Sequence, residues 1–167
     1  LDRLDDTPAQ VISDVAETLV QNRLAVALLG DQTSFDGFAR SAVYRWFTDP
    51  DERHRYPATD HELQSRVQVA NLRVSATRGG PHGRAAAIVE RLRVHSDQFE
   101  RIWSRHDVTG RPDNNKTIVH PVLGPIALQC QVLFTPDHGQ ALLVFTASPG
   151  SEDHSRLEML SAIGTQN

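Results

Sequence analysis

Hydrophobic residues along the chain change from an alternating pattern to a helical one, and back again. Residues 9–15 (AQVISDV) alternate, and a second extended run, ETLVQN, follows a break at Ala16. This pattern predicts a short β-hairpin near the N-terminus. From Asn22 to Gly30, leucine and alanine recur at helical spacing, which predicts a helix that ends at the glycine.

Residues 34–47 (SFDGFARSAVYRWF) carry apolar side chains at steps of three and four, which predicts one amphipathic helix. Asp49 precedes Pro50 in a pattern typical of a new helix start, with the aspartate as the capping residue. This second helix should be short, because Tyr56 is followed by a proline.

A capping box at residues 59–62 predicts the start of a long helix over residues 60–77. The glycine-rich segment RGGPHG (residues 78–83) should end this helix as a loop, since it lacks the residues of a phosphate-binding P-loop. Two further helices are expected after it, joined near residues 96–97.

Beyond Gly110 the apolar residues recur at every second position, as in a β-strand. In PIALQCQVLF (residues 125–134) alternate residues share one face, and the runs KTIVH and QALLVFTA flank it across turn sequences. Three antiparallel strands are expected, followed by a last helix that ends before Gly164. Strands from both ends of the chain can then form a five-stranded antiparallel sheet with the helices packed on one face. This α+β arrangement is that of PAS-type sensor domains, which leave an apolar space for a small molecule.

Composition and charge predict the class of protein. A chain of 167 residues with 39% hydrophobic residues should form one domain, and a net charge of −4 argues against strong DNA binding by this stretch. No apolar run approaches the ~20 residues of a membrane-spanning helix, and the acidic start LDRLDD does not resemble a signal peptide. Cys130 is alone and cannot form an internal disulfide. We therefore expect a cytoplasmic protein without membrane contact.

The segment FERIWSRHDV places Ser104, His106 and Asp107 close together in the sequence. Residues two apart on a helix point about 200° from each other, so Ser104 and His106 cannot form a catalytic hydrogen bond. His106 and His120 have either structural roles or polar roles in a ligand pocket. A small α+β enzyme with His106 as general base, assisted by Asp107 or Asp113, stays an alternative. The histidine spacing predicts no metal site.

Several stretches in order along the chain carry a family resemblance: LDRLDDTPAQVI, NRLAVALLGD, YRWFTDPDERHRYP, SDQFERIWSRHDVTG, IVHPVLGPIAL and LLVFTASPGS. Together they resemble the C-terminal ligand-binding domain of MmyB-like transcription regulators, which belong to the XRE helix-turn-helix class. The resemblance extends from Leu1 to about Leu160. One departure is Gln21, since relatives often carry a tryptophan before the asparagine that corresponds to Asn22.

This resemblance implies a PAS-like ligand-binding domain over residues 9–164 and a linker over residues 1–8. The linker would follow an N-terminal helix-turn-helix domain that binds DNA and is absent from this chain. The expected ligand is a small hydrophobic molecule such as a fatty acid, with no cofactor, and the expected assembly is a homodimer. A domain that serves only for dimerisation is a further alternative.

The resemblance also indicates where a ligand would lie. Trp103, His106 and His120 occupy motif positions expected to line the ligand space, and His106, His120 or Arg105 could donate to a carboxylate head group. The aromatic members of the set are expected to be core residues in the first place and pocket residues in the second. The complete expected set is Leu28, Phe38, Trp46, Phe47, Leu72, Phe99, Trp103, His106, His120, Cys130, Val132 and Phe145.

Overall fold

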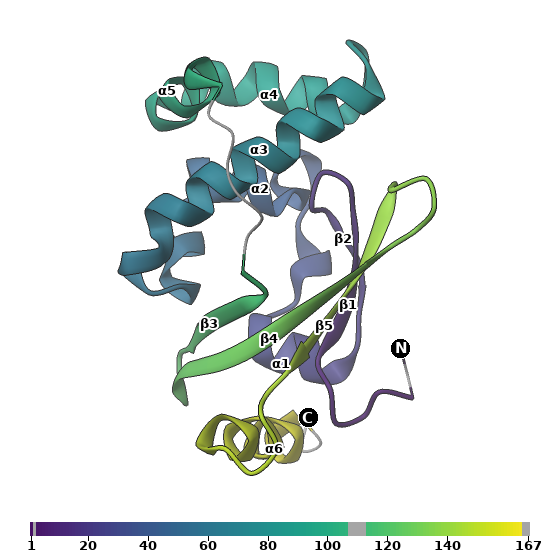
Figure 1. Ribbon diagram of the computed structural model, residues 1–167, viewed down its shortest axis with the longest axis vertical. Coiled ribbons are helices and arrows are strands. Elements are labelled where there is room, and N and C mark those ends of the chain that lie inside the picture. The colour runs from purple at the N-terminus through teal and green to yellow at the C-terminus, as the bar shows by residue number, and fades with distance from the viewer. Residues whose placement is uncertain (2, 107–112, 165–167) are drawn as a thin grey trace.

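The computed structural model describes residues 1, 3–106 and 113–164, and its centre is one antiparallel sheet of five strands. The strands are β1 (Ala9–Ser13), β2 (Thr18–Gln21), β3 (Asn115–His120), β4 (Gly124–Phe134) and β5 (Gln140–Thr146). Their order across the sheet is β2-β1-β5-β4-β3. Because β1 pairs with β5, strands from both ends of the chain meet in one sheet, as the sequence predicted (Figure 1).

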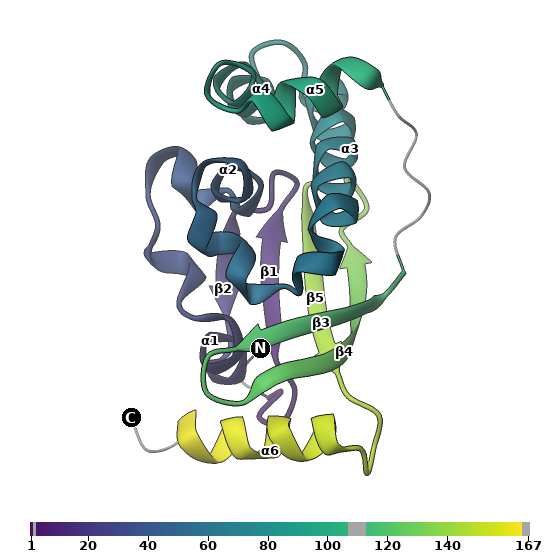
Figure 2. The same cartoon turned by 90° about the vertical axis from the view of Figure 1, so that its left-hand side faces the viewer.

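The helices lie mainly on one side of this sheet. They are α1 (Arg23–Leu29), α2 (Ala42–Thr48), α3 (His61–Gly79), α4 (Arg84–His95), α5 (Asp97–Arg105) and α6 (Glu152–Gly164), with 3-10 turns at Gln32–Ser34, Gly37–Arg40, Pro50–Arg55 and Ala58–Asp60. Figure 2 shows α1, α2 and α3 on the same side of the sheet, with α4 and α5 stacked on α3 and α6 at the opposite end. The predicted α+β class is confirmed, and the arrangement is compatible with a PAS-type domain.

Buried apolar residues form two separate clusters. The first, here called the sheet core, joins α1 and α6 to the helix-facing side of the sheet: Leu24, Leu28, Leu29, Ile118, Ile126, Leu128, Cys130, Phe145, Leu157 and Leu160. The second, here called the helical core, is formed mainly by α2 to α5: Val15, Val43, Trp46, Phe47, Val69, Leu72, Ala85, Ile88, Val89, Leu92 and Phe99. Tyr56 contacts both clusters.

The single helix predicted over residues 34–47 is wrong. Gly37 has a φ of 56°, in the left-handed region, and begins a 3-10 turn that ends before Ser41. The Ser41 hydroxyl accepts from the Tyr44 amide as the cap of α2 and donates to the Val15 carbonyl at 2.7 Å. This buried bond fixes the chain to the β1–β2 turn and separates the two helical pieces.

Of the two other helix starts predicted from capping residues, one is capped as predicted and one is not. Asp49 caps its short helix, as predicted, by accepting from the Asp51 amide at 3.0 Å, although that helix is of the 3-10 type. The capping box predicted at residues 59–62 does not form: the Thr59 hydroxyl donates to the Asp60 carboxylate at 3.3 Å, and Asp60 makes no side-chain cap bond to α3. A 3-10 turn leads directly into α3 instead and supplies its first hydrogen bonds.

Candidate functional site

Three of the residues expected to line a ligand space lie in the sheet core. Leu28, Cys130 and Phe145 are each at most 4% exposed and pack against α1, α6 and neighbouring strands. Burial raises the pKa of the Cys130 thiol, which keeps this side chain neutral. These three residues form a close-packed interior between the sheet and the two helices.

The aromatic residues of the expected set lie in or beside the helical core. Trp46, Phe47 and Phe99 are buried, as is Leu72, and Trp46 Nε1 donates to the Ser65 hydroxyl at 2.8 Å. Phe99 stacks on Trp103 with their ring centroids 5.6 Å apart. The partly buried members, Phe38 and Trp103, pack against the edge of this cluster. Nine of the twelve expected lining residues therefore lie in or beside the two cores.

His120 has a structural role in the turn between β3 and β4. Its Nε2 donates to the Ala27 carbonyl of α1 at 3.1 Å, while Nδ1 accepts from the amides of Val122 and Leu123 at 3.2 Å. Both ring nitrogens are thus engaged within the protein, and the side chain is 9% exposed. His120 has no free nitrogen with which to bind a carboxylate.

His106 lies at the exposed end of α5. It adopts a left-handed conformation with a φ of 53°, and its Nδ1 donates to the Ser104 carbonyl. The Ser104 hydroxyl donates to the Glu100 carboxylate at 2.8 Å and not to His106. Asp113 is exposed, and hydrogen bonds from Asn115 lower its pKa. Asp107 lies outside the described residues.

One expected residue, Val132, lies where the helices no longer cover the sheet. Alternate residues of β4 share a face, and along that face Ile126, Leu128 and Cys130 are at most 3% exposed. Farther along the same face, Val132 is 41% and Phe134 60% exposed. Leu143 of β5 pairs with Val132 and packs against the sheet core. We call Val132, Phe134 and Leu143 the inner strip.

The side of α3 nearest the sheet is polar. The Ser75 hydroxyl donates to the Asp14 carbonyl in the β1–β2 turn at 2.6 Å. Three polar residues lie on the same side of the helix as Ser75, because successive members of the series are four, three and four residues apart: Gln64, Gln68, Asn71 and Ser75. Within the described part of the chain, the buried Oε1 of Gln68 has no hydrogen-bond partner. A buried acceptor without a donor costs about 1–3 kcal/mol, so this amide requires a partner.

Lys116 is a candidate binding residue that the sequence reasoning missed. It is half-buried on β3 and alternates with the buried Ile118 and His120, so it shares the helix-facing side of the sheet. Its positive charge lowers the pKa of Cys130, opposing the effect of burial on that thiol. A signal was present in the sequence: Lys116 is the only lysine among 17 lysine and arginine residues.

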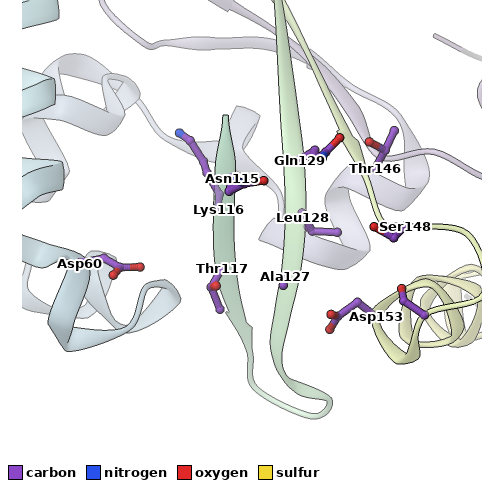
Figure 3. Close-up of a pocket in the computed structure, with 11 residues that line it drawn as sticks. Asp60, Asn115, Lys116, Thr117, Ala127, Leu128, Gln129, Thr146, Ser148 and Asp153 are labelled. Atoms are coloured by element: carbon purple, nitrogen blue, oxygen red, sulfur yellow. The ribbon is translucent and has the colours of Figure 1, made fainter. Parts of the chain in front are cut away.

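The surface grooves formed by the described residues include two beside the cores. One, of about 270 Å³, lies along β3, β4 and the start of α6 (Figure 3) and is lined by Asp60, Asn115, Lys116, Thr117, Ala127, Leu128, Gln129, Thr146, Ser148, Ser151 and Asp153. The other, of about 550 Å³, lies on α3, α4 and α5 and is lined by Ala76, Ala86, Val89, Glu90, Arg93, Val94, Glu100 and Trp103. Of the twelve expected lining residues, only Trp103 contributes to either groove.

The described residues were also compared with the requirements of a metal site and of a membrane-spanning helix. Among them, no group of three or more histidine, cysteine, aspartate or glutamate side chains could hold a metal ion. None of the described helices combines the length and the apolar character needed to cross a bilayer.

Comparison with known proteins agrees with the resemblance seen in the sequence. The family model described as the MmyB-like transcription regulator ligand binding domain matches residues 1–160. No curated protein matches the chain. Because the matched region covers nearly the whole sequence, together with every strand and the helices that cover them, the chain belongs to the MmyB-like transcription regulator ligand binding domain family.

Proposed function

We propose that this domain is the ligand sensor of a DNA-binding transcription regulator and that it binds a small hydrophobic molecule, with a fatty acid as the expected class. In this proposal residues 1–8 lead from an N-terminal DNA-binding domain, and the regulator acts as a cytoplasmic homodimer. The observation that carries the choice of ligand is the inner strip, an uncovered apolar surface that continues directly from the sheet core.

The inner strip supports acyl-chain binding through its exposed apolar surface. Val132 and Phe134 are 41% and 60% exposed on the face that is buried elsewhere along β4. Covering such surface with an acyl chain gains about 0.8 kcal/mol for each methylene removed from water. Several methylenes therefore supply useful affinity without covalent chemistry.

The strip also has a direct structural connection to the N-terminal segment. Leu143 pairs with Gln10 of β1, the strand that follows residues 1–8. The Asn22 side chain joins this segment to α1: its Oδ1 accepts from the amides of Ala9 and Ala25, and its Nδ2 donates to the carbonyls of Leu4 and Thr7. A ligand regulates only if it favours one of two arrangements, and this connection is where we expect them to differ.

Two neighbouring residues on β4 provide a matched test. Val132 lies on the helix-facing side and Leu133, 58% exposed, on the opposite side. We expect the delipidated 167-residue chain to bind dodecanoate in isothermal titration, and Val132→Gln to weaken that binding roughly tenfold, as the loss of one buried valine contact predicts. Leu133→Gln should leave the affinity unchanged. Equal effects of the two changes, or no binding by the unmodified chain, would overturn the proposal.

The enzyme alternative receives less support from the geometry. His106 is exposed at the end of α5, and within the described residues its ring is hydrogen-bonded to a backbone carbonyl of the same helix. A general base needs a substrate position within hydrogen-bond reach and a group that orients it. Replacing His106 by alanine should leave dodecanoate binding intact, whereas an enzyme that used His106 as base would lose its turnover.

A further inference from the structure

Lys116 is a cation at one end of an apolar path. It pairs with Leu128 of β4, and the residues that follow on the same face of β4 are Cys130, Val132 and Phe134. The seven residues from Leu128 to Phe134 span about 20 Å of extended strand. This is comparable with the length of an extended long-chain acyl tail. The path is buried beside Lys116 and opens progressively toward Phe134.

The ammonium group of Lys116 has no anionic partner in the described part of the chain. No hydrogen bond or ion pair joins it to any of those residues, although it is half-buried. Figure 3 shows its side chain extending from β3 away from β4. Asp60 lines the same groove, but its carboxylate is not within ion-pair distance. The sheet-facing side of α3 adds the uncharged amides Gln64 and Gln68.

The candidates expected from the sequence, His106, His120 and the exposed Arg105, are less suitable as a carboxylate anchor. Both nitrogens of His120 are engaged with backbone groups, and His106 is exposed at the far end of α5. Arg156 of α6 donates to the Pro125 carbonyl and to the carboxylate of Glu152. Lys116 therefore combines a positive charge, partial burial and an unused set of three donors.

We propose that Lys116 binds the carboxylate head group of the fatty acid, whose apolar chain is directed toward the inner strip at Val132. This inference rests on the proposed function and specifies which residue anchors its ligand. A compact ammonium suits a single carboxylate, which it binds as a point charge through rotatable donors. Gln68, whose buried Oε1 accepts no hydrogen bond from the described residues, is available on α3 to a protonated or hydroxylated group.

A pair of ligands that differ only in the head group tests the assignment. We expect Lys116→Met to weaken dodecanoate binding roughly tenfold or more, because a charge-assisted hydrogen bond is lost, and to leave 1-dodecanol binding unchanged. Lys116→Arg keeps the charge and should restore most of the dodecanoate affinity. Dodecanoate binding that is insensitive to Lys116→Met would overturn the assignment, as would equal weakening of acid and alcohol, while leaving the proposed function intact. Failure of both molecules to bind the unmodified chain would instead refute the proposed function.

The single lysine permits an independent measurement on the unmodified chain. Its amine can be acetylated with an amine-reactive ester, and peptide mapping distinguishes it from the N-terminal amine. We expect dodecanoate to slow acetylation of Lys116 severalfold and 1-dodecanol to slow it less, with the N-terminal amine as internal control. Equal acetylation of Lys116 with and without bound dodecanoate would contradict the proposal.

Discussion

The two halves of β4 present the same alternating pattern to different surroundings. In the first half, Leu128 and Cys130 are at most 3% exposed beneath α1 and α6, whereas in the second half Val132 and Phe134 are 41% and 60% exposed. Alternation determines which face a residue occupies, but the position of the covering helices determines whether that face is buried. The comparison separates residues that hold the fold together from residues available to a ligand.

The same distinction explains why the expected ligand residues fell mostly in the cores. Aromatic side chains bury large areas and dominate packed interiors, so Trp46 and Phe99 are explained by packing alone. A ligand surface is better indicated by incomplete burial and unused polar groups. Val132 and Lys116 have these properties, and the buried residues of the sheet core do not.

The largest expected effect belongs to the helical core. Phe99 is fully buried, with its ring edge-to-face against Phe47 at 5.2 Å. Phe99→Ala should lower the free energy of unfolding by about 3–5 kcal/mol, measured by urea denaturation. At a temperature where the variant is folded, dodecanoate affinity should be unchanged. Normal stability combined with lost affinity would show that Phe99 lines the ligand site.

An intermediate effect is expected at the junction with the N-terminal segment. Asn22→Ala removes a side chain that makes four hydrogen bonds, and should lower the free energy of unfolding by about 2 kcal/mol. Asn22→Asp keeps the two bonds accepted from Ala9 and Ala25 and should lose less. Hydrogen exchange should accelerate at residues 4–9 in both variants. Unchanged exchange there would contradict the role of Asn22 in holding this segment.

The smallest effect on stability is expected in the open half of β4. Val132→Gln and Leu133→Gln should each change the free energy of unfolding by at most about 0.5 kcal/mol, because both side chains are already exposed. Chemical denaturation of both variants checks this. A loss at Val132 as large as that at Phe99 would mean that the inner strip is part of the core.

Sequence periodicity was sufficient to predict the strands, their assembly into one sheet and the approximate positions of most helices. It was insufficient where a long-range contact decides the local structure. Ser41 interrupts an apolar stripe because it bonds to Val15, and nothing in the neighbouring residues indicates that partner. The buried Arg45 is similar, since its ion pair with Glu52 at 3.0 Å and its bond to Gln32 depend on chain segments brought together by folding.

The candidate site was harder to predict than the fold for a related reason. His120 belongs to the family stretch IVHPVLGPIAL. Its hydrogen-bond partners are backbone groups of α1 and of the β3–β4 turn, and the sequence of that stretch does not identify them. Lys116 was recognisable as the only lysine in the chain. That none of the residues in 1, 3–106 and 113–164 forms an ion pair with it depends on which residues the fold brings near it.

The central claim is that an acyl ligand lies along the inner strip, outside the two packed cores. The most direct test is an isotope-filtered nuclear Overhauser measurement on the 167-residue chain with bound dodecanoate. The account predicts contacts between the acyl chain and the methyl groups of Val132 and Leu143. Contacts to the methyl groups of Leu72 in the helical core, without any to Val132, would contradict it.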